Sequence, residues 1–113
     1  MAFTDYLENK LLAHTFSNTA YTSPSTVYVA LYTVAPTDST TGTEVTGGAY
    51  ARQSASFTTS GSATTNAAAI EYPTATANYG TVVAVAVLDA ASSGNMLAFA
   101  SLDANKTIAT GDV

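Results

Sequence analysis

The side chains that could carry out chemistry in this sequence are mostly carboxylates. A pair of acids hydrolyses a glycosidic bond when the two carboxyl groups face each other across a cleft, about 5 to 9.5 Å apart. Asp5 and Glu8 instead have the spacing of a helix-capping pair. Five further acids fall in expected loops: Asp38, Glu44, Asp89, Asp103 and Asp112. Acids among Thr, Asn and Gly are typical of turns, so they do not predict a catalytic pair.

His14 is the single histidine of the chain. A catalytic histidine needs an orienting partner, and Glu8, six positions earlier, does not lie on the same side of a helix. The chain has no Cys and no second His, which leaves no Cys-based metal site and no His pair. We therefore expect a structural His14, no enzymatic activity, no cofactor and no metal ion.

The charge balance argues against nucleic acids and membranes as partners. Eight acidic residues face three basic ones, Lys10, Arg52 and Lys106, and the formal net charge is −5. Binding to phosphates depends on clustered Lys and Arg side chains, as does binding to anionic membranes. Three scattered cations do not provide such a cluster.

The low content of charged residues also bears on how large a core the chain can form. Charged residues make up 10% of the chain, whereas about 25% is typical of globular proteins. Ser, Thr and Ala take their place, and the bulky apolar residues are periodic along the sequence. We expect an ordered fold with a thin core, which gains part of its stability from neighbouring molecules in an assembly.

The first residues predict a short helix. Thr4 or Asp5 can cap its first turn. One apolar strip contains Phe3, Leu7 and Leu11, and Leu12 and Phe16 form a second strip on another side. Burial of both strips against the chain's own sheet and loops is our first expectation, and contact with another chain is the alternative.

After the helix, the apolar pattern has a period of two, which predicts strands. We expect strands at residues 26–33, 50–57, 65–72, 82–88 and 96–102, with a short extended segment near 107–108. The predicted long loop and turns lie at residues 35–48, 60–62, 92–95 and 103–106. Both sides of the 82–88 segment are apolar, which predicts a central strand covered on both faces. The fold class is therefore all-β, an antiparallel β-sandwich resembling a jelly roll with a short N-terminal α-helix.

We expect a single domain over residues 1–113, with an N-terminal helix arm at 1–17 and the β-sandwich at 26–113. Uncharged, Tyr-containing surfaces suit protein–protein contacts. The tyrosines expected on such a surface are Tyr21, Tyr28, Tyr32, Tyr50 and Tyr79. The residues that we predict to contact a protein partner are Phe3, Tyr6, Leu12, Phe16, Tyr21, Thr43 and Val45.

Several short segments follow one another along the chain: FTDYLEN (3–9), NTAYT (18–22), VALYT (29–33), PTD (36–38), GTEV (42–45), YARQ (50–53), YPTAT (72–76) and GN (94–95). Together they resemble a family of short tailed-bacteriophage virion proteins, often labelled tail fibre protein. Members of that family continue past the Gly–Asp pair near the end of this sequence. The resemblance therefore implies a last strand that is truncated at Val113.

The resemblance implies a structural role in the virion without catalysis. The expected role is that of a capsid decoration (cement) protein on the capsid surface, which forms dimers or trimers and binds between subunits of the major capsid protein. The alternative is a tail or tail-fibre component involved in host attachment, with other virion proteins as partners. A free carbohydrate-binding module is a further alternative, disfavoured by the absence of Trp.

Overall fold

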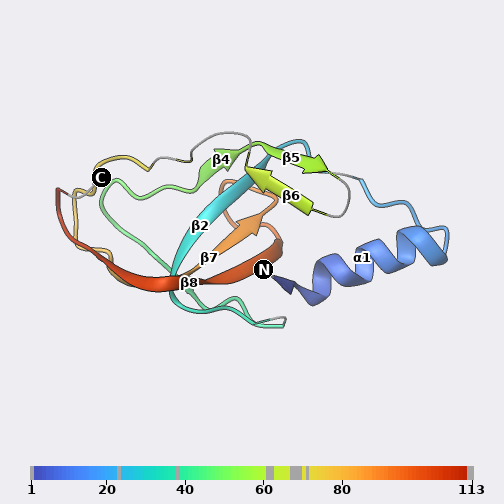
Figure 1. Cartoon of the computed structure of the whole chain (residues 1–113), viewed down its shortest axis with the longest axis horizontal. Coiled ribbons are helices and arrows are strands. Elements are labelled where there is room, and N and C mark those ends of the chain that lie inside the picture. Colours follow the sequence, from blue (N-terminus) through green and yellow to red (C-terminus); the bar gives the residue numbers. More distant parts are fainter. Residues whose placement is uncertain are drawn as a thin grey trace.

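The structure is a computed structural model that describes residues 2–22, 24–37, 39–60, 63–66, 70 and 72–111 (Figure 1). Its elements in chain order are β1 (Ala2–Phe3), α1 (Asp5–Phe16), β2 (Val27–Val34), β3 (Thr43–Glu44), β4 (Gln53–Ala55), β5 (Phe57–Ser60), β6 (Ala63–Asn66), β7 (Gly80–Leu88) and β8 (Met96–Ile108).

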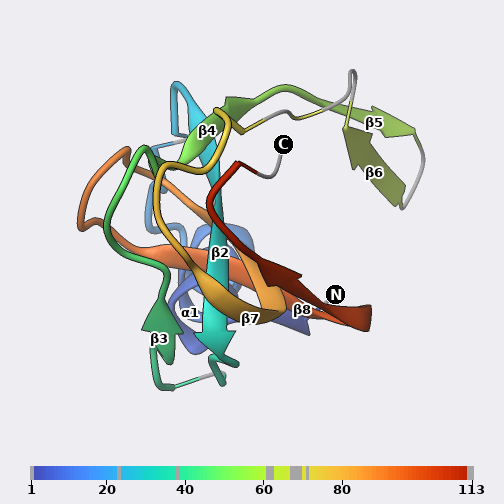
Figure 2. The ribbon, with the colours of Figure 1, turned by 90° about the vertical axis from the view of Figure 1, so that its left-hand side faces the viewer.

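Six of the strands form one antiparallel sheet, in which five follow the order β1–β8–β7–β2–β3 and the sixth, β4, also pairs with β2. The outer edge of β2 is shared between two short strands, because β4 pairs with its first half and β3 with its last residues. Strands β5 and β6 form a separate two-stranded sheet, which lies apart from the larger one (Figure 2). An all-β antiparallel fold with a short N-terminal helix is confirmed, while the jelly-roll connection stays a prediction.

Strands β2 and β7 lie where the apolar alternation predicts strands. The expected strand at 50–57 is shorter and interrupted, because β4 begins at Gln53 and Ser56 separates β4 from β5. In the expected 65–72 strand, only the first residues belong to β6, and Ile70 and Tyr72 have no strand structure. Residues 67–69 and 71 of that segment, residues 61–62 of the expected turn and residues 112–113 lie outside the described part of the chain.

The predicted turn at 103–106 is wrong, because β8 runs through it. Val82 pairs with Lys106 and Ala84 pairs with Ser101. Residues 102–105 of β8 therefore lie opposite Val83 alone, which makes this part of β8 a large bulge. Small polar residues suit a bulge as well as a turn, and bulges are common at the edges of sheets. Composition alone did not separate the two.

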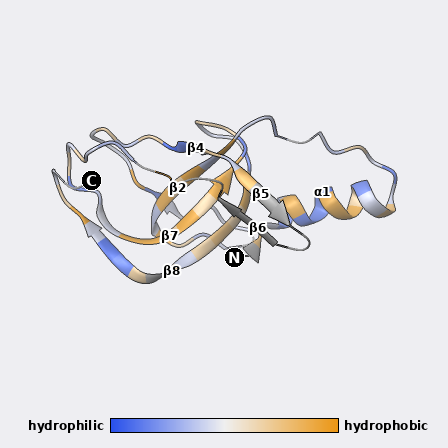
Figure 3. Ribbon diagram, turned by 45° about the horizontal axis from the view of Figure 1, so that its top comes forward, coloured by the Kyte–Doolittle hydropathy of each residue, from blue (hydrophilic) through white to orange (hydrophobic). Residues whose placement is uncertain are grey.

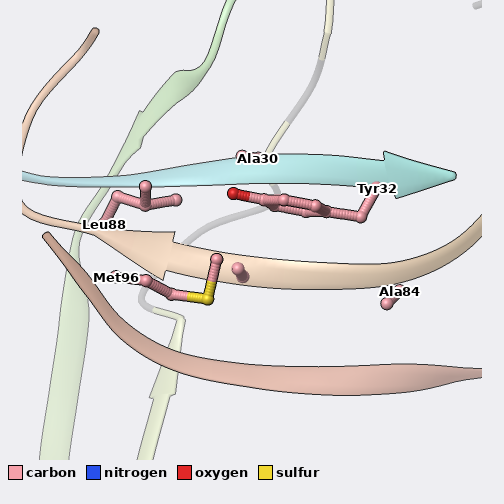
Figure 4. Packing of buried hydrophobic residues seen from close by; sticks show 6 residues of the cluster. Ala30, Tyr32, Ala84, Leu88 and Met96 are labelled. Carbon is pink, nitrogen blue, oxygen red and sulfur yellow. The ribbon is translucent and has the colours of Figure 1, made fainter. Parts of the chain in front are cut away.

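The core consists of two clusters of buried side chains. The first lies on β2, β7 and the start of β8 and contains Ala30, Tyr32, Ala84, Ala86, Leu88 and Met96. In Figure 4 the ring of Tyr32 extends along β2 toward Leu88. The second cluster joins β7 to two loops and contains Val45, Ala75, Tyr79 and Val82. Loop residues thus cover a part of the sheet that a second sheet covers in a sandwich.

Strand β7 is central, but its two faces are not equally covered. Val82, Ala84, Ala86 and Leu88 are buried, whereas the three valines between them are only half-buried. The expectation that both faces are covered is therefore correct for one face only. On the covered face the fully buried alanines leave little space, because their small side chains allow close packing.

We predict that Ala86→Leu destabilises the fold by about 1–3 kcal/mol, because the added carbons must displace packed neighbours. Ala104→Leu is the matched control, since Ala104 is exposed in the bulge of β8, and its effect stays within about 0.5 kcal/mol. Urea denaturation measures both variants. Equal stability of Ala86→Leu and the wild type would show that the first cluster contains unfilled space.

Candidate protein-contact surface

The start of the chain is fixed to the sheet at Thr4. Strand β1 pairs with β8, and the Thr4 backbone N–H then donates to the Leu97 carbonyl at 2.9 Å. The Thr4 hydroxyl donates to the Met96 carbonyl at 2.5 Å and accepts the Leu7 backbone N–H at 3.4 Å. Thr4 is only 4% exposed. One side chain therefore caps α1 and also attaches it to β8.

From this point α1 extends away from the sheet (Figure 1), and none of its residues is buried. Figure 3 shows apolar turns along α1 that alternate with polar ones. Leu11 is 37% exposed, Leu12 55% and Phe16 79%. The expectation that the chain's own sheet and loops bury both apolar strips is wrong. The cap at Thr4 sets the direction of the helix, and only its first turns come near β8.

The segment after α1 turns back along one side of the helix. The backbone N–H groups of Ser17 and Thr19 both donate to the Ala13 carbonyl, and Asn18 between them has a left-handed backbone with φ of 54°. The Tyr21 N–H then donates to His14 Nδ1 at 3.2 Å. His14 is thus a structural residue, as the sequence predicts, since its ring nitrogen holds the returning chain.

The predicted contact residues divide into two groups. We define the N-terminal arm as residues 2–17, comprising β1, α1 and the two cap residues Thr4 and Ser17. Phe3, Leu12 and Phe16 are exposed on this arm, and Tyr6 is half-buried near its start. Tyr21 is half-buried in the returning segment, where partial burial raises its pKa, with smaller effects from Tyr6 and Asp89.

The other two predicted residues lie in and after β3. Thr43 is exposed. Val45 is 3% exposed and belongs to the second core cluster, so it offers no surface to a partner. Its burial was not visible in the sequence, because nothing local shows that the loop after β3 folds onto the start of β7.

A polar network that we did not predict from the sequence connects two loops. The Arg52 guanidinium binds both carboxylate oxygens of Glu44, at 2.8 and 2.9 Å. Its third nitrogen donates to the Ala90 and Ser93 carbonyls at 3.0 and 2.8 Å. The Tyr50 hydroxyl also donates to Glu44, at 2.7 Å. The only signal in the sequence is that Arg52 is the one arginine among eight acids.

The network sets the charge state of its members. Burial by itself raises the pKa of Glu44, but the hydrogen bonds from Arg52 and Tyr50 outweigh burial and leave the pKa below its ordinary value. Burial and the bond to Glu44 raise the pKa of Tyr50. The carboxylate therefore holds the loops as an ion, and its oxygens are already in use.

Two tyrosine hydroxyls close the gap that β3 and β4 leave on the edge of β2. The Leu31 N–H donates to the Tyr50 hydroxyl at 3.1 Å, and the Tyr72 hydroxyl donates to the Val29 carbonyl. The two rings are stacked with their centroids 6.0 Å apart. The Tyr50 hydroxyl thus satisfies a backbone N–H of β2 that lies between the residues paired with β4 and those paired with β3, and the Tyr72 hydroxyl bonds to β2 at its last pair with β4.

The expectation that the tyrosines form a contact surface is therefore wrong for several of them. Tyr32 and Tyr79 are buried in the core, and Tyr50 is half-buried in the network.

The described part of the chain contains no group of three His, Cys, Asp or Glu side chains placed to hold a metal ion. Within the same residues, no helix has the length and apolarity needed to cross a membrane.

We predict that Thr4→Val, which keeps the shape of the side chain and removes the hydroxyl, loosens α1. Loss of the cap costs about 0.5–2 kcal/mol, and two β8 carbonyls lose a donor. Circular dichroism at 222 nm then shows less helix. Thr4→Ser is the control because it keeps the hydroxyl. Equal helix content in both variants would contradict the assigned role of Thr4.

We predict that Glu44→Gln lowers stability at pH 7 by about 1.5–3 kcal/mol, because it removes charged hydrogen bonds. The lowered pKa of Glu44 means that its contribution is present above the ordinary value of 4.5 and is lost as the pH falls through the lowered pKa. The difference between wild type and variant is therefore full between pH 7 and pH 4.5 and closes as the pH falls further, through the lowered pKa of Glu44. Thermal unfolding over this range measures it, and a constant difference would refute the ion pair.

The comparisons with known proteins agree with this picture of a structural protein. A family model described as "Podophage GP4 fiber I protein gp80" matches residues 2–113. No curated protein matches the chain. The match covers nearly the whole sequence, and it confirms the resemblance to tailed-phage virion proteins. The chain belongs to the Podophage GP4 fiber I protein gp80 family, a family of bacteriophage fibre-type virion proteins.

Proposed function

We propose that this chain is a component of the phage tail or its fibres, and that it attaches to the particle through its N-terminal arm without doing chemistry. The exposed apolar side of α1 is the observation that carries the proposal. The family description, which names a fibre protein, supports the tail over the capsid surface.

The arm is poorly suited to remain free in water. An isolated helix as short as α1 is marginally stable, and α1 comes near the sheet only at its N-terminal end (Figure 1). Burial of a Leu or Phe side chain contributes about 1.5–3 kcal/mol. Leu12 and Phe16 stay 55% and 79% exposed within the chain, so a neighbouring virion protein that covers them would stabilise both the arm and the attachment.

The polar side chains support a role without catalysis. His14 Nδ1 accepts a backbone N–H, and the Glu44 carboxylate is bound by Arg52 and Tyr50. Both carboxylate oxygens of Asp89 accept hydrogen bonds from Asn95. Groups held in this way serve the fold, and we propose that the protein has no substrate.

A capsid decoration protein is the second candidate. The body is small, with extents of 49 × 28 × 25 Å including the arm, and the sequence has no repeat of the kind that builds a fibre shaft. In this role the arm would bind between subunits of the major capsid protein, and the chain would form dimers or trimers there. Copy number and position in the particle separate the two roles.

We predict few copies per virion, located at the tail. Quantitative mass spectrometry of purified particles gives the ratio of this chain to the major capsid protein, and electron microscopy with a labelled antibody gives its position. Label confined to one vertex supports the tail. A copy number near that of the capsid subunits, with label over the whole head, would instead establish decoration, and absence from purified particles would refute both roles.

A further inference from the structure

The two sides of α1 differ in what covers them. The returning segment lies along the side that contains Ala13 and His14, and it bonds to both residues. The opposite side is open. We define the free side of α1 as the exposed residues found there: Asp5, Glu8, Leu11, Leu12, Thr15 and Phe16.

Helix geometry gives the order of residues around the free side. Successive residues turn by about 100° around the axis. Leu12 and Phe16 therefore form one edge of the free side, and Leu11 forms the other. Glu8 and Thr15 lie between these edges. The free side thus combines three large apolar side chains with two carboxylates, because Asp5 lies in the first turn on the same edge as Leu12 and Phe16, and Glu8 lies between the edges.

We propose that the free side of α1 is the attachment face of this protein, and that it fits an apolar groove of a different virion protein with a Lys or Arg side chain opposite Glu8. This inference rests on the proposed function, because it names the face and the kind of partner through which the arm attaches.

The width of the free side favours a groove over a single helix. Helix α1 has 12 residues and is about 18 Å long. A packed partner helix covers one line of contact along such a surface. The edges formed by Leu11 and by Leu12 with Phe16 lie too far apart for one line of contact. A groove that receives the helix covers both edges together, as in other helix-in-groove complexes.

The charge of Glu8 favours a different protein over a second copy of this chain. If copies packed together through their free sides, the contact would contain the Asp5 and Glu8 carboxylates of both copies and no cationic side chain of α1 on that side to pair with them. Like charges brought together in an apolar environment repel strongly. The whole chain also carries a net charge of −5, so copies repel one another at longer range. A cationic side chain in the partner removes both costs.

The test uses the purified full-length chain and phage particles that were assembled without it. Leu12→Gln and Phe16→Gln place a polar group on the free side, and Gln is compatible with a helix. Val34→Thr is the matched control, because Val34 lies elsewhere and is 55% exposed, the same as Leu12. Co-sedimentation with particles gives the dissociation constant, and circular dichroism verifies that α1 is present.

We expect each Gln variant to weaken binding at least about tenfold, which equals about 1.4 kcal/mol. Val34→Thr changes the dissociation constant less than about twofold. If the wild-type chain binds and both Gln variants bind equally well, the attachment face is wrong while the proposed function stands. If the wild-type chain itself does not bind to particles, the proposed function fails.

Glu8→Gln distinguishes a cationic groove of another protein from a second copy of this chain as the occupant of the free side. The variant weakens binding to the first and strengthens binding to the second. With a cationic groove, the variant binds particles more weakly and with less dependence on salt. With a second copy on the free side, the loss of repulsion strengthens self-association in analytical ultracentrifugation, and Leu12→Gln weakens it. That second outcome would overturn the proposal.

Discussion

The position of the N-terminal arm depends on the hydrogen bonds of one buried side chain, Thr4. Its hydroxyl joins the first turn of α1 to a carbonyl 92 positions further along the chain. A helix end leaves N–H groups without partners, and a strand edge leaves carbonyls without partners. Thr4 satisfies groups of both kinds at one point. Because that point lies at the start of α1, the helix is oriented by the sheet and yet remains outside it.

The body is organised around a sheet with a modest apolar core. Alanine occupies central positions of β2 and β7, so neighbouring elements approach closely but bury little apolar surface there. Directed polar contacts supplement this packing. The Glu44–Arg52 pair connects β3 to the turn before β8, and the hydroxyls of Tyr50 and Tyr72 bond to the open edge of β2. Loops thus replace strands as the cover of the sheet.

These two features support the proposed role in an assembly. The polar side chains of Glu44, Tyr50 and Arg52 are occupied internally, and the arm keeps its largest apolar side chains outside. A thin core and an uncovered apolar helix are both unfavourable for a molecule alone in solution. In the proposed role, a neighbouring protein that covers the arm would add to the stability of the chain. Membership of a fibre-type virion family fits this division.

Features that depend on near neighbours could be predicted from the amino-acid sequence. These are a capped helix, the strands β2 and β7, a structural His14 and the all-β class, because propensity, period and capping act over a few residues. Contacts between distant segments became known only from the fold. It left α1 uncovered, buried Val45, paired Glu44 with Arg52 and turned an expected loop into a bulge of β8. Each of these outcomes follows from register and direction between distant segments, which a local pattern does not specify.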